Sequence, residues 1–266
     1  MRPGATPDAA VAAAASHTLL TLLTPLPDSP QKQAAIDLIA GAFLTTLGAP
    51  PYAPAIQDGI TVRHPESEET DVARFWPGGG SNWNVTTRTI VSSKSLDRWQ
   101  LGRLLALLNI AQADAAIVNQ QWKYTYTSWR PVTAIRWPDD GNPETGSDPG
   151  WRPFLVTPPY PDYPCALPTL TAAAATVLRE YFGTDAVAFT RTFPAAAVPL
   201  PAPMAALPAK SITRSFQSLS AAVAEAIDAR VFAGIHFREG CEAGARQGTQ
   251  VARFVTRHSL RPLDDR

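Results

Sequence analysis

The sequence is poor in the features that define several common protein classes. Its two cysteines, Cys165 and Cys241, are too few for a disulfide framework. It has no run of about 18 or more uncharged apolar residues, so no membrane span is expected. Its 23 Lys and Arg balance 23 Asp and Glu, which argues against a general nucleic-acid binder. A local anion pocket stays compatible with this balance, since net charge does not say where charges lie.

The remaining composition indicates a folded chain. Hydrophobic residues make up 45% of the 266 residues, which excludes a disordered protein. We find no internal repeat and no boundary between two self-sufficient cores, and therefore predict one domain over residues 1–266. The 26 prolines cluster between apolar runs, where they mark loops.

Apolar residues follow a helical period almost throughout the chain, with Ser95 as the predicted N-cap of the longest helix. The predicted helices are Pro7–Leu23, Pro30–Leu47, Lys94–Trp122, Thr169–Phe182, Ser211–Phe232 and Glu242–His258. The predicted breaks, rich in Pro or Gly, are Gly48–Tyr52, Pro77–Gly80, Pro138–Trp151, Thr157–Pro168 and Thr192–Pro208. No useful run of alternating apolar residues is present, so we predict an all-α helical bundle with long loops.

The N-terminus allows two interpretations. The Ala-rich run up to Leu23 loosely resembles a signal peptide, but Asp8 and His17 interrupt it. Its apolar positions fall on one helical face, which favours a structural amphipathic helix. We expect a cytoplasmic protein, with a targeting segment and export as the alternative.

Three distant segments each carry part of an anion site. Lys123 is separated by six residues from Arg130-Pro131, and Arg230 by five residues from His236. Between these blocks a Pro-rich loop leads directly into a predicted helix, whose first turn would present free backbone N–H groups that favour anions. Taken alone, the first block also fits a solvated basic turn.

This ordered set resembles the vanadium-dependent haloperoxidases and type-2 phosphatidic acid phosphatases, which share one fold and one anion site. The resemblance covers residues 71–255 and includes the strings KYTYTSWRPVTAIR, TPPYPDYP and GIHFREGCEAG. It implies a helical bundle in which Lys123, Arg130 and Arg230 bind an oxyanion. It also implies that His236 would be the vanadate ligand, or the phosphoryl-accepting nucleophile of the phosphatases.

The chain departs from the family pattern at the acid–base position. Where the family has Pro-Ser-Gly-His, this sequence has Pro164-Cys165-Ala166-Leu167. Leu167 has no ionisable atom and cannot replace that histidine, while Cys165 is a weaker hydrogen-bond donor than serine. The Asp that closes the third block is Gly240 here. We interpret the site as degenerate, either repurposed or retired.

The remaining candidates have supporting roles. Ala166 would contribute its backbone N–H to anion binding. Glu239 would orient His236 if both shared a helix face, and Asp114 is expected to be a structural partner of an arginine. No metal or other cofactor is expected, although vanadate or phosphate would fit the anion pocket. The expected partner is a small anionic or carbonyl-containing molecule, with no nucleic acid and no membrane; a homodimer stays open.

Three functions remain open. The first is a vanadium-independent, non-redox enzyme of secondary metabolism that catalyses rearrangement, cyclisation or elimination, with His236 as acid–base group and Cys165 as second reactive group. The resemblance supports it, because the family includes non-redox members in natural-product pathways. The second is residual phosphatase or vanadate-dependent haloperoxidase activity. The third is a non-catalytic homologue that acts as a binding partner.

Overall fold

The computed structural model describes residues 67–76, 82–138, 145–193 and 211–261. The predicted helices Pro7–Leu23 and Pro30–Leu47 lie outside the described residues, as do the candidate targeting segment and the break at Gly48–Tyr52. That residues 1–266 form one domain therefore stays a prediction.

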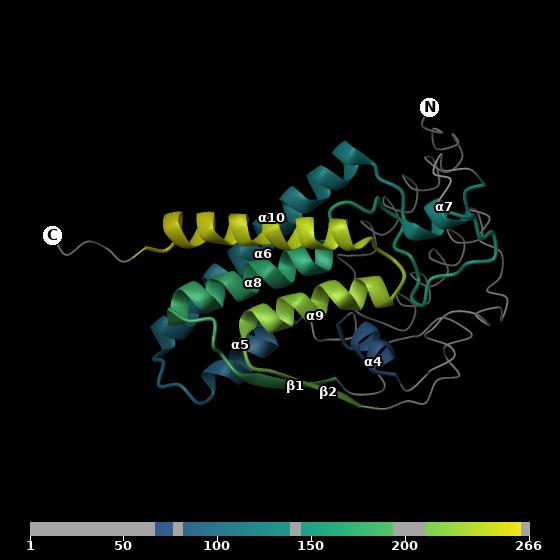
Figure 1. Cartoon of the computed structure of the whole chain (residues 1–266). Helices are drawn as coiled ribbons and strands as arrows, with labels where there is room; N and C mark the ends of the chain where they lie inside the picture. The colour runs from purple at the N-terminus through teal and green to yellow at the C-terminus, as the bar shows by residue number, and fades with distance from the viewer. Residues whose placement is uncertain (1–66, 77–81, 139–144, 194–210, 262–266) are drawn as a thin grey trace, which may run out of the picture. The chain divides into compact units, whose positions relative to one another are not determined.

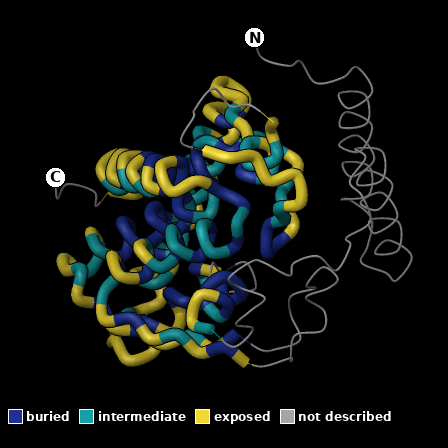
Figure 2. The backbone as a smooth tube through the Cα atoms, turned by 45° about the vertical axis from the view of Figure 1, so that its right-hand side comes forward, coloured by how far each residue is buried: buried dark blue, intermediate teal, exposed yellow. Residues whose placement is uncertain are grey.

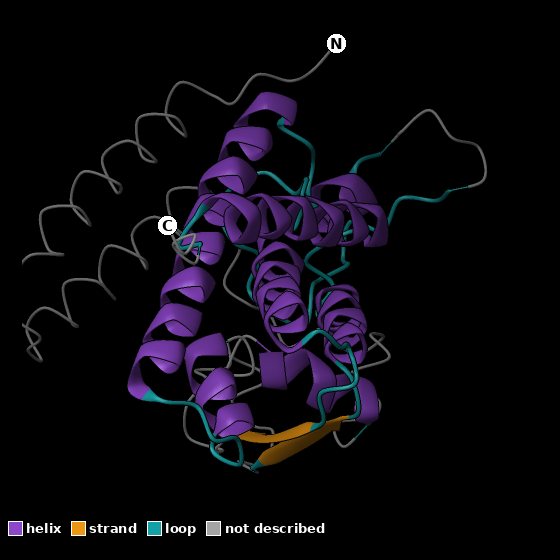
Figure 3. Cartoon of the chain, turned by 90° about the vertical axis from the view of Figure 1, so that its left-hand side faces the viewer, coloured by secondary structure: helices purple, strands orange, loops and turns teal. Residues whose placement is uncertain are grey.

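The described part of the chain is mostly helical, which confirms the predicted fold class. In chain order its elements are α4 (Glu68–Phe75), α5 (Trp83–Val91), α6 (Arg98–Tyr126), α7 (Pro131–Arg136), α8 (Ala166–Phe182), β1 (Phe189–Phe193), β2 (Ile212–Phe216), α9 (Leu219–Phe232) and α10 (Arg238–His258). Figure 1 shows α8 beside α9 and α10, with α6 crossing behind, and Figure 3 shows the two strands together at one end of the helices.

Helix α6 begins at Arg98 and ends at Tyr126, four residues later at each end than predicted. Its N-cap is Asp97 rather than Ser95, because the Asp97 carboxylate accepts the N–H groups of Trp99 and Gln100 while the Gln100 side chain returns to the Asp97 N–H. This reciprocal capping box satisfies donors that a helix otherwise leaves free. The helix ends at Thr127, which adopts a left-handed conformation with φ 46° and turns the chain towards α7.

Helix α8 lies at the centre of the packing, between α6, α9 and α10. Figure 2 shows buried segments running through the middle of the helical part and exposed segments along its outside. The contact between α8 and α10 is the closest, because Gly244 and Gly248 bring the α10 backbone against Cys165 and Thr169. A Cβ at Gly248 would overlap the Thr169 carbonyl oxygen, so only glycine allows this approach.

The two strands are a correction to the sequence prediction. Strand β2 occupies the start of the predicted helix Ser211–Phe232, and only the later part of that range forms α9. The strands pair antiparallel, with Arg191 opposite Arg214. The central position of each strand is therefore an arginine. Arg214 forms ion pairs with Glu225 and Glu68. Because a charged residue interrupts the alternation of apolar residues in each strand, the sequence pattern does not indicate a strand.

One described segment, Arg98–Arg136, is long and apolar enough by length and composition alone to cross a membrane. Its best 18-residue window has a mean hydropathy of 1.4 and is 28% buried. In the structure the inner face of α6 packs against α8 and α10 and contributes the buried Leu104, Leu108 and Asn119.

Candidate active site

The candidate site lies where several helix ends meet. The N-terminal ends of α8 and α10 and the C-terminal end of α9 lie on the same side in Figure 1, together with the loop that precedes α8. Six buried residues lie there, and we refer to them together as the candidate site: Lys123, Arg130, Asp162, Cys165, Arg230 and His236.

Arg130 joins the segments. It is the N-cap of α7, and Pro131 at the first helical position needs no partner for a backbone N–H. Its Nε donates to the Tyr160 carbonyl at 2.9 Å and its Nη1 to the Ile235 carbonyl at 2.7 Å. Nη1 also lies 2.8 Å from His236 Nε2. The spaced sequence blocks therefore meet at this guanidinium.

Lys123, in the last turn of α6, has no exposed surface. Its Nζ donates to the carbonyls of Pro161 and Asp162 at 3.0 and 2.9 Å and lies over the Tyr160 ring. Burial, and then the charge of Arg130, lower the pKa of Lys123 to about 8. The lysine thus fixes the loop before α8 as well as adding charge to the site.

The free energy of unfolding should rise between about pH 8 and the ordinary lysine pKa of about 10.4. Over that range the unfolded chain holds a proton on Lys123 that the native protein has lost, so raising the pH favours the native state. The rise attributable to Lys123 should reach about 3 kcal/mol at most. Urea unfolding of the wild type and Lys123→Met at pH 7 and pH 10 measures it; a stability difference that does not change with pH would contradict it.

Buried donors without partners indicate where an anion would bind. Among the described residues, nothing hydrogen-bonds to Arg130 Nη2 or Arg230 Nε, and both side chains are more than nine-tenths buried. Buried guanidinium groups with unpaired N–H are costly, and the two charges repel each other. A bound oxyanion would satisfy both groups at once.

His236 lies just before Phe237, the N-cap of α10, and is 4% exposed. An arginine can only donate, so the 2.8 Å contact with Arg130 makes His236 Nε2 the acceptor and places the ring proton on Nδ1. Nδ1 lies 2.8 Å from Asp162 Oδ1, without the alignment of a full hydrogen bond. Asp162 is not among the residues predicted from the sequence, because it comes from the Pro-rich loop rather than from the segment of His236.

Cys165 is the N-cap of α8 and is completely buried. Its N–H donates to the Gly240 carbonyl at 2.9 Å, which ties the start of α8 to α10. Burial raises the pKa of the Cys165 thiol, but a hydrogen bond from Cys241 and the positive charge of Arg230 lower it well below its usual range. Donation to Cys165 and burial raise the pKa of Cys241, so Cys241 stays protonated as the donor. Both cysteines are free.

Iodoacetamide should alkylate Cys165 with a pH midpoint below the ordinary cysteine pKa of about 8.5. The thiolate is the reactive form, and Cys241 stabilises it by donating a hydrogen bond. Mass spectrometry of alkylated peptides across pH gives the midpoint. Cys241→Ser keeps a donor and should preserve it, whereas Cys241→Ala should raise it. A wild-type midpoint at or above the free-thiol value would make Cys165 an inert space-filling residue.

Helix α8 begins at Ala166, three residues before the predicted start at Thr169, and its first turn contains no proton carrier. Ala166 and Leu167 are its first two residues, and Pro168 follows within the turn. The Leu167 side chain packs against the hydrophobic core. The site therefore keeps its cationic part, while the position of the family's acid–base histidine is filled by an apolar side chain.

Two predicted supporting residues do not join the site. Asp114 is half-buried on α6, nine residues before Lys123, which places it on the opposite side of the helix. Glu239 is exposed in the first turn of α10, whereas His236 precedes that helix, so they do not share a helix face. The carboxylate nearest His236 is Asp162.

Aromatic rings lie beside the buried polar groups. Trp122 and Tyr126 are 5.6 Å apart between ring centroids, and Tyr126 and Tyr163 are 5.3 Å apart. Trp122 and Tyr126 are 39% and 47% exposed. They flank Lys123 on α6 and offer an apolar surface to the organic part of a ligand.

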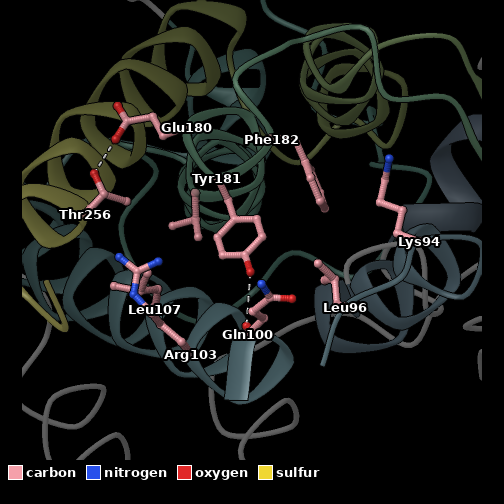
Figure 4. A pocket seen from close by; sticks show the side chains of 10 residues that line it. Lys94, Leu96, Gln100, Arg103, Leu107, Glu180, Tyr181, Phe182 and Thr256 are labelled. Carbon is pink, nitrogen blue, oxygen red and sulfur yellow. Dashed lines mark hydrogen bonds between the residues drawn. The ribbon is translucent and has the colours of Figure 1, made fainter. Parts of the chain in front are cut away.

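A separate pocket of about 690 Å³ lies at the other end of α8. In Figure 4 the Tyr181 side chain points to Gln100, and a hydrogen bond joins Thr256 to Glu180 beside this pocket. Because α8 has 17 residues, its ends are about 25 Å apart. This pocket is therefore distinct from the candidate site.

Comparison with known proteins agrees with this geometry. Residues 103–265 match the family model described as the VCPO second helical-bundle domain. A curated relative, vanadium chloroperoxidase from Curvularia inaequalis, is 28% identical over 141 residues, covering 43% of this chain and 23% of that protein. A bacterial vanadium-dependent iodoperoxidase structure aligns with a TM-score of 0.61 and 28% identity, covering 78% of this chain and 47% of that chain.

The holo form of a bacterial vanadium-dependent chloroperoxidase aligns with a TM-score of 0.57 over 79% of this chain and 51% of that one. Its 19% identity supports the fold alone. The chain thus spans less than a quarter of the curated relative and about half of the solved ones. The family match covers most of the sequence, and the chain belongs to the family of VCPO second helical-bundle domains, within the vanadium haloperoxidase superfamily.

Proposed function

We propose that this protein is a vanadium-independent, non-redox enzyme of secondary metabolism that acts on an anionic or carbonyl-containing small molecule. The reaction class is rearrangement, cyclisation or elimination, in which protons move and no external oxidant is consumed. A cytoplasmic location and action away from nucleic acid and membranes belong to the same proposal.

One observation carries this proposal. Unpartnered guanidinium donors of Arg130 and Arg230 converge with His236 and Cys165, while Leu167 fills the family's acid–base position. The two arginines can hold a negatively charged oxygen. His236 and Cys165 can move a proton near it. The leucine removes the group that the family uses for bound peroxide or for a leaving alcohol. The site is therefore suited to stabilising an enolate or related oxyanion.

The residues also fit a tetrahedral inorganic oxyanion. Arg130 and Arg230 would hold vanadate or phosphate through their unpaired N–H groups, with Lys123 adding charge and His236 as the nearest ring nitrogen. Bound vanadate would supply peroxide activation. Leu167 leaves that chemistry without its proton carrier, so we expect binding of such anions as inhibitors.

His236 is the acid–base group of this proposal. In the free protein its Nε2 accepts from Arg130 Nη1. A substrate oxyanion would draw Arg130 onto itself and release the Nε2 lone pair, which can then remove a proton from the substrate. Cys165, whose thiol has a lowered pKa, is a second basic or nucleophilic group within hydrogen-bonding range of His236. The aromatic rings of Trp122 and Tyr126 favour a substrate with an apolar organic part.

Proton exchange in D2O tests the proposal without knowledge of the product. The protein would be incubated with a panel of α-hydroxyketones, β-ketoacids and 2-oxoacids, and ¹H NMR would follow loss of the proton beside the carbonyl. We expect exchange or conversion of at least one member, abolished by His236→Ala and competitively inhibited by phosphate. Arg130→Gln should raise KM more than it lowers kcat, because the guanidinium binds the anion.

Other outcomes identify the alternatives. Hydrolysis of aryl phosphates, or bromide oxidation with vanadate and peroxide, would indicate residual family chemistry. Binding of panel members with no exchange and no conversion would indicate a non-catalytic homologue. Either outcome would overturn the proposed non-redox activity.

A further inference from the structure

The segment that carries His236 lacks the carboxylate that the family pattern places after the histidine. The family pattern ends four residues after the histidine in an aspartate, and this chain has Gly240 there. We propose that Asp162, from the loop before α8, supplies the missing carboxylate and is the positioning residue for His236. The functional meaning of this role rests on the proposed function, but its geometry does not.

The position of Asp162 depends on the absence of a side chain at 240. A Cβ built on Gly240 would lie 3.0 Å from Asp162 Oδ2. The Asp162 carboxylate thus lies beside the α10 backbone, where the side chain of a larger residue at position 240 would crowd it. One carboxylate fits there, and this chain provides it from a different segment.

Three backbone contacts hold the loop that carries Asp162. The Asp162 N–H donates to the Ser128 carbonyl at 3.0 Å, and its carbonyl accepts from Lys123 Nζ at 2.9 Å. Lys123 also binds the preceding carbonyl of Pro161. Among the described residues, Asp162 is the only buried Asp or Glu. Its oxygen Oδ1 also lies 3.9 Å from Arg130 Nη1, which helps to compensate a buried negative charge.

The contact with His236 defines what Asp162 does. The ring is held between Arg130 at Nε2 and Asp162 at Nδ1, each at 2.8 Å. Asp162 keeps the proton on Nδ1 and leaves the Nε2 lone pair directed at the anion site. If Nε2 then takes a proton from a substrate, the nearby carboxylate stabilises the imidazolium ion that forms.

Moving the carboxylate back to position 240 tests the assignment. Asp162→Ala, Gly240→Asp and the double variant would be compared with the wild type by ¹H–¹⁵N NMR of the histidine rings, without substrate. In the wild type we expect a His236 Nδ1–H signal whose proton is protected from water. Asp162→Ala should lose that signal, and the double variant should recover it. Gly240→Asp alone should be less stable than the double variant, because it places two carboxylates together.

Exposed Glu239 provides the matched control, and Glu239→Gln should leave the His236 signals unchanged. If Asp162→Ala does not fold, the isosteric Asp162→Asn replaces a charged acceptor by a neutral one and should shift the Nδ1 proton upfield. Persistence of the wild-type signals in Asp162→Ala or Asp162→Asn would overturn the proposal. So would a folded double variant without the signal. Failure of the proposed activity would instead appear only in the exchange assay with substrates.

Discussion

Bromide oxidation by this protein, with vanadate and hydrogen peroxide supplied, should be at least about 100-fold slower than that of active vanadium haloperoxidases. The reason is Leu167, which packs against the core where the family has a proton-handling histidine. Positioned acid–base groups typically contribute about 10²–10⁴-fold in rate. Halogenation of monochlorodimedone gives the rate directly, and a rate typical of active haloperoxidases would contradict this prediction.

Restoring the family residues should recover part of that rate. Leu167→His with Cys165→Ser returns both the proton carrier and a stronger hydroxyl donor to the first turn of α8. Leu170→His, one turn further along the same helix, is the matched control for adding an imidazole elsewhere. A gain in both would show that the effect does not depend on position.

Gly248→Ala should be among the most destabilising single substitutions in the described part of the chain. Its Cβ would overlap the Thr169 carbonyl oxygen and approach Ala173 N to 3.1 Å, both of them backbone atoms of α8. Backbone atoms cannot rotate away as a side chain can, so α10 and α8 would have to separate. Overpacking usually costs about 1–3 kcal/mol, and we expect a loss at or above the upper end. Urea or thermal unfolding measures it.

Gly102→Ala is the matched control. Gly102 also lies inside a helix, but a Cβ there meets nothing within 4 Å. Because alanine is a better helix former than glycine, this variant should gain up to about 1 kcal/mol. Equal effects of the two substitutions would show that helix propensity, rather than the contact between α8 and α10, dominates at Gly248.

The site could be predicted from the sequence where spacing alone determines position. Lys123 and Arg130 sit on either side of one helix end, so their separation along the chain fixes their separation in space. Arg230 and His236 are related in the same way across the end of α9. Residues tied to such short blocks come together once the bundle forms.

Asp162 could not be found in this way. Glu239 is the acid predicted to orient His236 because it is close in sequence, but the structure places it at the surface. The sequence feature that points to Asp162 is Gly240, because a residue without a side chain leaves room for a carboxylate from another segment. Strands β1 and β2 were missed for a related reason: Arg191 and Arg214 occupy positions where alternation predicts apolar residues.

The burial of the candidate site has a kinetic consequence. Cys165 and Lys123 have no exposed surface, and His236 has almost none. In the enzyme we propose, a ligand would reach these groups only through opening of the surrounding structure, and the rate of its encounter would then be limited by that opening rather than by diffusion. The same opening step would also slow departure and lengthen the residence time of a bound molecule. If the proposed function holds, a reactive intermediate formed inside would complete its rearrangement before water could intercept it.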